Sequence, residues 1–397
     1  MVHAMGNRVV VKFGGADLST AERIRKAAEM ILRTSYKEVV VVVSAIGKTT
    51  DNLIGVMSEI GRIDDRDYAE IVSMGERTSA RIFCSALKSL GANAVYVDPA
   101  EDNWPIITDS NFCDAKPDIE KTMTLVKKYL EPMLSESIPV VCGFLGRDEH
   151  GNITTLGRGG SDITALLIAN CLEADEVILV KDTDGVLSAD PKIVPNARLL
   201  GKIDIYEMFS LALGGAKIIR PEALKYKLPN QKLRILNFSS ESLDIEKTEI
   251  TGVFNSNSPQ MVKHRNLSAI SLVGDVSSAN LSKLFSTIYA KSIYGVCTGK
   301  KSITVFTSPE NANETVNQLH ALGCFKAVSY RGKVGMIEVV HPDFIDSPGW
   351  IAKISSALGS KNINIIEVTT SKATINVFID EEKLELAFET IGDVFEA

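Results

Sequence analysis

The stretch Arg8-Val-Val-Val-Lys-Phe-Gly-Gly15 predicts a strand over residues 8–13, with three consecutive valines, that ends in two glycines. A second strand is expected at Glu38-Val-Val-Val-Val-Val-Ser44, whose five consecutive valines lack the polar alternation of a half-exposed strand. Continuous apolar strands of this kind are typical of a parallel sheet that is covered on both faces. Residues 20–34, between the two runs, have the apolar spacing of a helix. The sequence therefore predicts a β-α-β unit at the start of an α/β domain.

The alternation of strands and helices continues along the first half of the chain. Further strands are expected at residues 94–97, 138–143 and 176–181, and further helices at 51–61, 68–91, 116–136 and 161–172. The pattern predicts one α/β domain over residues 1–250, built on a mainly parallel sheet between helical layers.

A polar stretch at residues 255–260 separates this domain from two shorter β-α-β-β-α series. The first series is expected to have strands at 267–273, 292–297 and 302–307 and helices at 279–290 and 311–323. The second is expected to have strands at 335–340, 364–369 and 374–379 and helices at 349–361 and 382–390. This repeat predicts two α+β domains, 262–333 and 334–397, and a single larger α+β domain is the alternative.

Composition and charge exclude several classes of protein. The 397 residues are 45% hydrophobic and 23% charged, which is typical of a folded globular chain. Because 50 acidic residues outnumber 43 Lys and Arg, no overall positive field would attract nucleic acid or an anionic membrane. No apolar run has the length of a bilayer span, and residues 1–7 lack the pattern of a signal peptide, so we expect a cytoplasmic location. The cysteines have no Cys-x-x-Cys spacing, and no metal site is predicted from them.

The first chemical motif is Lys12-Phe-Gly-Gly15 at the end of a predicted strand. Two glycines let backbone N–H groups approach an oxyanion closely, and Lys12 places a positive charge beside them. A surface turn is the alternative interpretation of this short motif. The nearest match to a Walker loop, residues 295–301, fails in spacing and in its last residue, and no Gly-x-Gly-x-x-Gly follows a strand.

The second motif is Thr155-Leu-Gly-Arg-Gly-Gly-Ser-Asp162, which leads directly into a predicted helix. Its glycines permit close backbone approach, and the helix N-terminus favours a negative group. Arg158 has the geometry to bind a carboxylate through two hydrogen bonds. Asp162 is unexpected at an anion site unless a cation or an ammonium group accompanies it. The alternative is that Ser161 or Asp162 only caps the helix.

Six motifs, taken in order, resemble the successive signatures of the aspartate kinase family. They are Lys12-Phe-Gly-Gly15, Val43-Ser-Ala-Ile-Gly-Lys-Thr-Thr-Asp51, Ser73-Met-Gly-Glu-Arg77, Gly151-Asn-Ile-Thr-Thr-Leu-Gly-Arg-Gly-Gly-Ser-Asp162, Asp184-Gly-Val-Leu-Ser-Ala-Asp-Pro191 and Gly215-Ala-Lys217. The resemblance implies an amino acid kinase fold over residues 1–250. The two smaller units resemble the paired ACT regulatory domains of the same family, which have a ferredoxin-like α+β fold.

The resemblance implies transfer of the γ-phosphoryl group of ATP, with Mg²⁺, to the β-carboxylate of L-aspartate, giving 4-phospho-L-aspartate. This is the first step of lysine, threonine and methionine biosynthesis. The implied catalytic residues are Lys12, Gly14, Gly15 and Asp162, with Asp162 organising Lys12 or the Mg²⁺. The implied aspartate-binding residues are Arg158 for the α-carboxylate, Glu76 for the α-amino group, and Thr50 and Ser161. The implied nucleotide-binding residues are Lys12, Gly14, Gly15, Lys181, Asp182, Leu187, Lys192 and Lys217.

Departures from the family pattern concentrate on the nucleotide side. The chain has Ala16-Asp17 in place of Thr-Ser, and Lys181 in place of a threonine. Leu187, Lys192 and Arg220 replace a tyrosine, an arginine and a histidine. We expect altered adenine and ribose contacts with catalysis retained. Two other functions remain open: a kinase of the same fold that acts on acetylglutamate or glutamate, and a non-catalytic amino-acid sensor.

The second small unit contains a predicted effector site. Asp346, Ser347 and Gly349 lie between its first strand and the following helix. They offer an acidic group for an ammonium and a helix N-terminus for a carboxylate. The resemblance implies threonine or lysine as the effector. Because a small unit leaves an edge strand open, we also expect a homodimer or a larger homo-oligomer formed through these domains.

Overall fold

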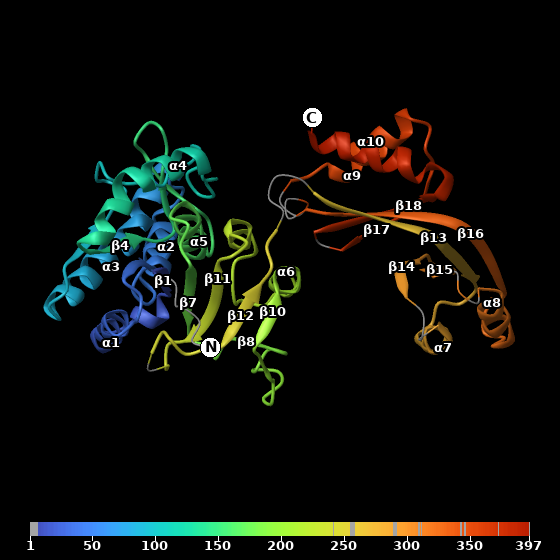
Figure 1. The fold of residues 1–397 in the computed structure, drawn as a ribbon, viewed down its shortest axis with the longest axis horizontal. Helices are drawn as coiled ribbons and strands as arrows, with labels where there is room; N and C mark the ends of the chain where they lie inside the picture. Colours follow the sequence, from blue (N-terminus) through green and yellow to red (C-terminus); the bar gives the residue numbers. More distant parts are fainter. Residues whose placement is uncertain are drawn as a thin grey trace. The chain divides into compact units, whose positions relative to one another are not determined.

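The structure of the chain is a computed structural model. It describes residues 7–240, 242–254, 259–288, 292–308, 310, 312–341, 344, 347–371 and 373–396. The chain divides into two compact units, Met1–Phe254 and Asn255–Ala397 (Figure 1). Among the described residues, every helix is too short or too polar to cross a membrane.

The first unit is built on an eight-stranded sheet. Its strand order is β10-β12-β11-β7-β1-β2-β4-β3, and every neighbouring pair is parallel except β11 with β12. The strands are β1 Arg8–Phe13, β2 Glu38–Val43, β3 Ala94–Val97, β4 Ile138–Cys142, β7 Glu176–Lys181, β10 Lys202–Asp204, β11 Lys232–Asn237 and β12 Thr248–Thr251. The central strands β1, β2 and β7 are buried along almost their whole length, so both faces are covered. The predicted mainly parallel α/β sheet is confirmed.

Helices cover this sheet. They are α1 Ala21–Leu32, α2 Thr49–Ile60, α3 Asp65–Ser89, α4 Ile119–Leu125, α5 Gly160–Cys171 and α6 Ile205–Leu213. Helix α5 packs on β1, β2 and β7, and α3 packs on β2, β3 and β4. Two small hairpins are β5 Leu145–Arg147 with β6 Ile153–Thr155, and β8 Val186–Leu187 with β9 Leu199–Leu200.

The predicted long helix over residues 116–136 is wrong in its second half. Regular α-helix ends at Leu125, and the chain continues as a π-helical turn, Val126–Leu130, and a 3₁₀ turn, Glu131–Ser135. Pro132 explains the change, because it has no backbone N–H to donate to the preceding turn.

A buried ionic network lies where β7 and β11 begin. Arg234 Nε donates to Glu176 Oε1, and both side chains are only 4% exposed. The hydroxyl of Tyr36 donates to the other oxygen of Glu176, and Arg234 Nη1 donates to the carbonyl of Ile245 at 2.7 Å. Each charge is therefore fully paired inside the protein.

The second unit is built on a six-stranded antiparallel sheet of order β14-β15-β13-β16-β18-β17. Its elements are β13 Gln260–Val273, α7 Ser278–Ile288, β14 Ile293–Thr298, β15 Ser302–Thr307, α8 Ala312–Ala321, β16 Ala327–Val340, α9 Trp350–Ser360, β17 Ile365–Ser371, β18 Thr374–Asp380 and α10 Leu384–Glu396. The order of strands and helices agrees with the two predicted β-α-β-β-α series.

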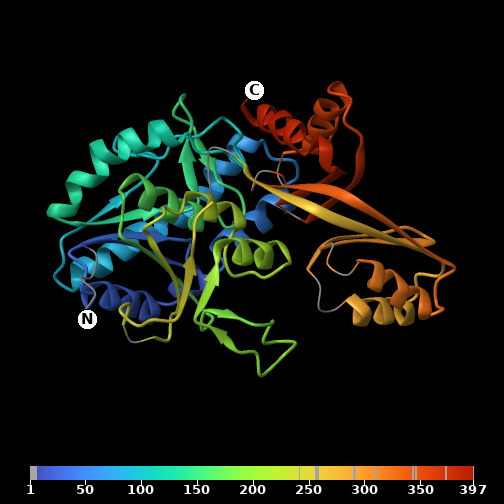
Figure 2. The same ribbon diagram turned by 45° about the vertical axis from the view of Figure 1, so that its right-hand side comes forward.

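Strands β13 and β16 are each at least twice as long as predicted, and they run through both halves of this unit (Figure 2). The second half of β13 pairs with β15, and its first half pairs with the second half of β16. The first half of β16, in turn, pairs with the second half of β13. The boundary predicted between residues 333 and 334 falls inside β16, so the division of this unit into two domains stays a prediction.

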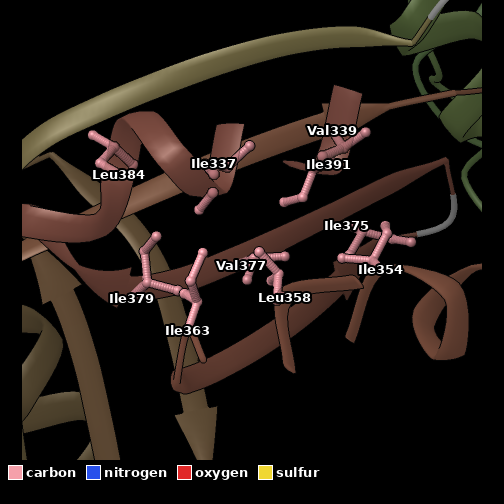
Figure 3. Packing of buried hydrophobic residues seen from close by; sticks show 11 residues of the cluster. Ile337, Val339, Ile354, Leu358, Ile363, Ile375, Val377, Ile379, Leu384 and Ile391 are labelled. Atoms are coloured by element: carbon pink, nitrogen blue, oxygen red, sulfur yellow. The ribbon is translucent and has the colours of Figure 1, made fainter. Parts of the chain in front are cut away.

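Three apolar clusters stabilise the second unit. One lies where α9 and α10 pack on β16 and β18, with Ile337, Leu358, Val377 and Ile391 among its buried members (Figure 3). A second lies under α7 and α8. The third joins the two halves, and in it the rings of Phe306 and Phe378 stack with centroids 3.7 Å apart.

Candidate active site

Polar side chains gather where the parallel strands of the first unit end. Strands β1, β2, β4 and β7 run in the same direction, so their carboxyl ends meet at one edge of the sheet. This edge is where ligands bind in open α/β sheets. Lys12 lies near the end of β1 and the two glycines follow that strand, Lys181 ends β7, and Asp162 lies in the first turn of α5.

Asp162 binds two lysines. Lys181 Nζ donates to both of its carboxylate oxygens at 2.9 Å, and Lys12 Nζ lies 3.0 Å from Oδ1. The side chains of Lys12, Asp162 and Lys181 are 7%, 5% and 17% exposed. We call these three residues the lysine cluster. The pairing of Asp162 with Lys12 is the one that the sequence led us to expect.

The charges in the lysine cluster do not cancel. Burial tends to raise the pKa of Asp162, but the attraction of the two ammonium groups prevails and lowers it to about 2, so this carboxyl is ionised at neutral pH. Burial, with repulsion from Lys12, lowers the pKa of Lys181 to about 8 despite the attraction of Asp162. One negative and two positive groups leave a net positive charge in a buried place, which favours an anionic ligand.

The glycine turn after β1 packs tightly against the turn after β2. A Cβ atom on Gly15 would lie 2.7 Å from the carbonyl oxygen of Ala45 and 3.0 Å from that of Gly47, so only glycine allows this contact. The N–H of Gly14 donates to Asp17 Oδ2 at 3.0 Å, and Asp17 is 1% exposed. An anion would reach the Gly14 amide only by displacing Asp17. Asp17 is one of the departures from the family pattern, and its contact with Gly14 was not predicted from the sequence.

Glu76 of α3 supplies an unpaired carboxylate oxygen near the lysine cluster. Its Oε1 accepts a hydrogen bond from the N–H of Ala45 at 3.0 Å. Its Oε2 is buried and, within the described part of the chain, has no hydrogen-bond partner. Burial raises the pKa of Glu76 to about 7, against the weaker opposing effects of the Ala45 amide and of Lys12. A buried, unpaired carboxylate oxygen is costly unless a ligand donates to it.

Two hydroxyls lie close to these groups. Ser161, at the start of α5, accepts a hydrogen bond from Ser44 Oγ at 3.0 Å. Thr50 Oγ1 would lie 3.3 Å from a Cβ placed on Gly75, so this hydroxyl borders the residue before Glu76. Ser44 was missed in the sequence analysis, because its position depends on how α5 meets the end of β2.

Arg158 lies in a turn between two glycines with left-handed backbone, Gly157 at φ +69° and Gly159 at φ +73°. Its side chain is exposed, and among the described residues we find no hydrogen bond or ion pair to its guanidinium. Burial raises the pKa of Tyr68 in α3, and the positive charge of Arg158 opposes this rise. Arg158 therefore lies on the side of the site formed by α3. The guanidinium is therefore available to a ligand.

The predicted nucleotide-binding residues are dispersed. Lys181 belongs to the lysine cluster. Asp182 is exposed, and its negative charge contributes to raising the pKa of Asp17. Leu187 is half-buried in β8, while Lys192 and Lys217 are exposed on later loops. No contact described in the structure joins Lys192 or Lys217 to the lysine cluster.

The described residues contain no group of three His, Cys, Asp or Glu side chains arranged to hold a metal ion. Both oxygens of Asp162 already accept from Lys181, and one oxygen of Asp17 accepts from Gly14. These carboxylate oxygens therefore already accept hydrogen bonds from groups of the protein.

The predicted effector residues border a pocket of about 750 Å³ in the second unit. Ser347 and Gly349 line it, together with Phe344, Trp350 and Thr370. Gly349 caps α9 with a left-handed backbone, φ +98°. Asp346 lies outside the described residues.

Comparison with known proteins agrees with this architecture. Residues 7–237 match the amino acid kinase family, and residues 330–393 match an ACT domain. An aspartokinase of Corynebacterium glutamicum is 32% identical over 413 residues, which cover 98% of this chain and 96% of that protein. An aspartokinase of Pseudomonas aeruginosa is 31% identical over 415 residues, covering 98% and 97%.

Solved structures show the same fold. The aspartate kinase from Synechocystis has a TM-score of 0.76 and 26% identity, over 98% of this chain and 70% of that one. Aspartokinase III of E. coli, solved in complex with aspartate and ADP, has a TM-score of 0.58 and 20% identity, over 98% of this chain and all of that one. On the strength of the full-length relatives, the chain belongs to the amino acid kinase family and, within it, to the aspartokinases.

Proposed function

We propose that the chain transfers the γ-phosphoryl group of MgATP to the β-carboxylate of L-aspartate and forms 4-phospho-L-aspartate. The observation that supports this best is the juxtaposition of two kinds of group at one sheet edge. The lysine cluster suits phosphate oxygens, and Glu76 offers an unpaired buried oxygen to an ammonium group. Full-length relatives that are aspartokinases support the same reaction.

The reaction needs charge neutralisation more than proton transfer. The β-carboxylate is an anion at neutral pH, so it can attack phosphorus without a general base. Catalysis then consists of positioning the reactants and stabilising negative charge on the transferring group. Lys12 is placed to do this, and Asp162 holds its ammonium in position. Mg²⁺ enters as part of the MgATP substrate, bound by the nucleotide phosphates.

The aspartate substrate is expected to bind on the α3 side of the site. Glu76 Oε2 would accept from the α-ammonium, and the free guanidinium of Arg158 would bind the α-carboxylate. Ser161 and Thr50 supply hydroxyls beside them. The nucleotide would extend from the glycine turn toward Asp182, with Leu187, Lys192 and Lys217 reaching it from later loops.

The pH dependence of aspartate binding tests the role of Glu76. Only the ionised carboxylate attracts an ammonium group, and the pKa of Glu76 is raised to about 7. In the wild type, kcat/KM for aspartate should therefore fall about tenfold for each pH unit below 7 and level off above it. Glu76→Gln should lower kcat/KM at pH 8 by about 10- to 150-fold, the equivalent of losing one hydrogen bond to a charged group.

The glutamine variant should also lose the acid limb of the pH profile, because no titrating group remains at that position. Glu59→Gln, an exposed change on α2, is the matched control and should leave the profile unaltered. A flat wild-type profile from pH 6 to 8 would remove Glu76 from the ammonium site.

The reaction itself is tested by measuring ADP release with each acceptor. We expect release that depends on L-aspartate and that exceeds release with acetylglutamate or glutamate. Greater activity with either of those acceptors would identify a different kinase of this fold. No ADP release with any acceptor would favour an amino-acid sensor without catalysis.

We further propose that the second unit binds an amino-acid effector and joins subunits into a homo-oligomer. The pocket at Ser347 and Gly349 supports the first part, and the open edges of β14 and β17 support the second. One E. coli aspartokinase III structure contains lysine with aspartate, and its likeness to this chain shows the fold alone. Lysine or threonine is our proposed effector, in a cytoplasmic enzyme of amino-acid biosynthesis.

Calorimetric titration of the intact protein with lysine and with threonine tests the effector site. We expect one of them to bind at or below millimolar concentration and to lower activity. Ala352→Trp, which fills the pocket from α9, should abolish this binding and leave activity without effector unchanged. Binding that survives in Ala352→Trp would place the effector elsewhere, and no binding of either amino acid would contradict the proposal.

A further inference from the structure

The lysine cluster contains one more cation than its carboxylate can neutralise. Asp162 accepts from Lys181 through both oxygens while it also pairs with Lys12. We propose that Lys181 is a second residue that binds the transferring phosphoryl group, and that its ammonium shares the phosphate oxygens with Lys12. This inference rests on the proposed function and identifies a second cation for the step that was assigned to Lys12 with the Gly14 and Gly15 amides.

The position of Lys181 supports this role. Lys181 ends β7, and β7 pairs directly with β1, whose Lys12 lies opposite Leu179 in the sheet register. The charge of Lys12 tends to lower the pKa of Glu76, which lies on the side proposed to bind aspartate. Asp182 follows Lys181 in the chain and lies on the side proposed to bind the nucleotide. The two ammonium groups thus lie between the two substrates, where the phosphoryl group must pass.

The glycine turn after β1 offers a phosphate fewer free hydrogen-bond donors than its sequence suggests, so a second cation would stabilise the phosphate. The Gly14 amide donates to Asp17, so this donor is occupied before any anion arrives. The carboxyl group of Asp17 lies near Lys12, and Arg23 Nη2 is 3.4 Å from its Oδ1. Lys181 restores positive charge at the phosphate end of the site.

The charge on Lys181 depends on pH in the free protein. Lys12 repels it from β1, Asp162 attracts it from α5, and burial disfavours the ammonium, so its pKa falls to about 8. Asp17 and Glu76 face Lys12 electrostatically, and Arg23 faces Asp17. A bound phosphate would favour the ammonium form again.

The binding experiment compares nucleotides with and without a γ-phosphate. Wild type, Lys181→Met and Lys181→Arg are titrated with Mg²⁺ and either β,γ-imido-ATP or ADP. We expect Lys181→Met to weaken binding of the imido-ATP about tenfold or more, with a clearly smaller change for ADP. Lys181→Arg keeps a positive charge and should lie between wild type and Lys181→Met. Lys232→Met, at the other end of neighbouring β11, is the matched control.

The kinetic experiment follows kcat/KM for ATP between pH 7 and 10. In the wild type it should fall above pH 8, and in Lys181→Arg it should stay level, because the guanidinium does not deprotonate. Lys181→Met should lower kcat/KM about 100-fold at pH 7.5 with the aspartate KM little changed. If Lys181 only held Asp162 in place, Lys181→Arg would show the same fall in kcat/KM for ATP above pH 8 as the wild type.

Equal loss of ADP and imido-ATP binding in Lys181→Met, or no loss of either, would overturn the proposal. So would a wild-type profile that stays level to pH 10. The binding measurement needs no turnover, so it tests Lys181 even if aspartate is not the acceptor. Absence of aspartate-dependent ADP release would instead contradict the proposed function.

Discussion

Replacing Lys12 by alanine is expected to lower kcat by two or more orders of magnitude and to change the KM for aspartate little. Negative charge develops on the transferring phosphoryl group in the transition state, and the buried ammonium of Lys12 is placed to stabilise it. An interaction that strengthens only in the transition state appears in kcat rather than in KM. Steady-state kinetics with both substrates varied measures the two effects separately.

The fold should tolerate this change, because Asp162 keeps its two hydrogen bonds to Lys181. Lys37→Ala, an exposed change just before β2, is the control and should have wild-type kinetics. A kcat within tenfold of the wild type would show that Lys12 has no part in the chemical step. A raised aspartate KM with unchanged kcat would place Lys12 in substrate binding instead.

Replacing Arg234 by methionine should destabilise the first unit by about 3–5 kcal/mol, because it leaves the carboxylate of Glu176 buried without its counter-ion. Chemical unfolding measures the effect. The chain has two tryptophans, and Trp104, fully buried in the first unit, becomes a specific fluorescent reporter in a Trp350→Phe background. We expect the unfolding midpoint of this signal to shift to lower denaturant concentration.

The double change Glu176→Leu with Arg234→Leu distinguishes the cost of an unpaired charge from the loss of the pair. With both charges removed, most of the lost stability should return. Arg25→Ala, which breaks an exposed ion pair with Glu29 on α1, should shift the midpoint little. If Arg234→Met were as stable as the wild type, Glu176 would have to become protonated or reach water without lowering the free energy of unfolding.

The sequence predicted five strands of the eight-stranded sheet, β1, β2, β3, β4 and β7, because they are mostly apolar runs, and it missed β10, β11 and β12. Residues 8–13, 94–97 and 176–181 were predicted with the bounds that the structure has. The first halves of β13 and β16 were missed for the opposite reason. Residues 260–266 and 327–333 are mostly polar and are partly or fully exposed, so they pair through backbone hydrogen bonds without any apolar run to mark them.

The site was predictable to the extent that its motifs are local. Lys12 and Asp162 belong to separate motifs. The residues alone indicated that a cation should accompany Asp162, and the family resemblance implied Lys12 or Mg²⁺ in that place. The contact of Lys181 with the same carboxylate depends on the register of β7 against β1. The hydrogen bond from Gly14 to Asp17 and the unpaired oxygen of Glu76 depend on side-chain positions that spacing in the sequence does not specify.

The exchange of strand halves between β13 and β16 also affects how the second unit can fold during synthesis. When β13 leaves the ribosome, only its second half can find a partner in the residues that follow at once, β14 and β15. Its first half must wait for the second half of β16, which is synthesised after α7, β14, β15 and α8. Such late, non-local pairing slows folding. During that interval the nascent chain exposes an unpaired strand edge, which is a surface for chaperones or for mispairing with another copy.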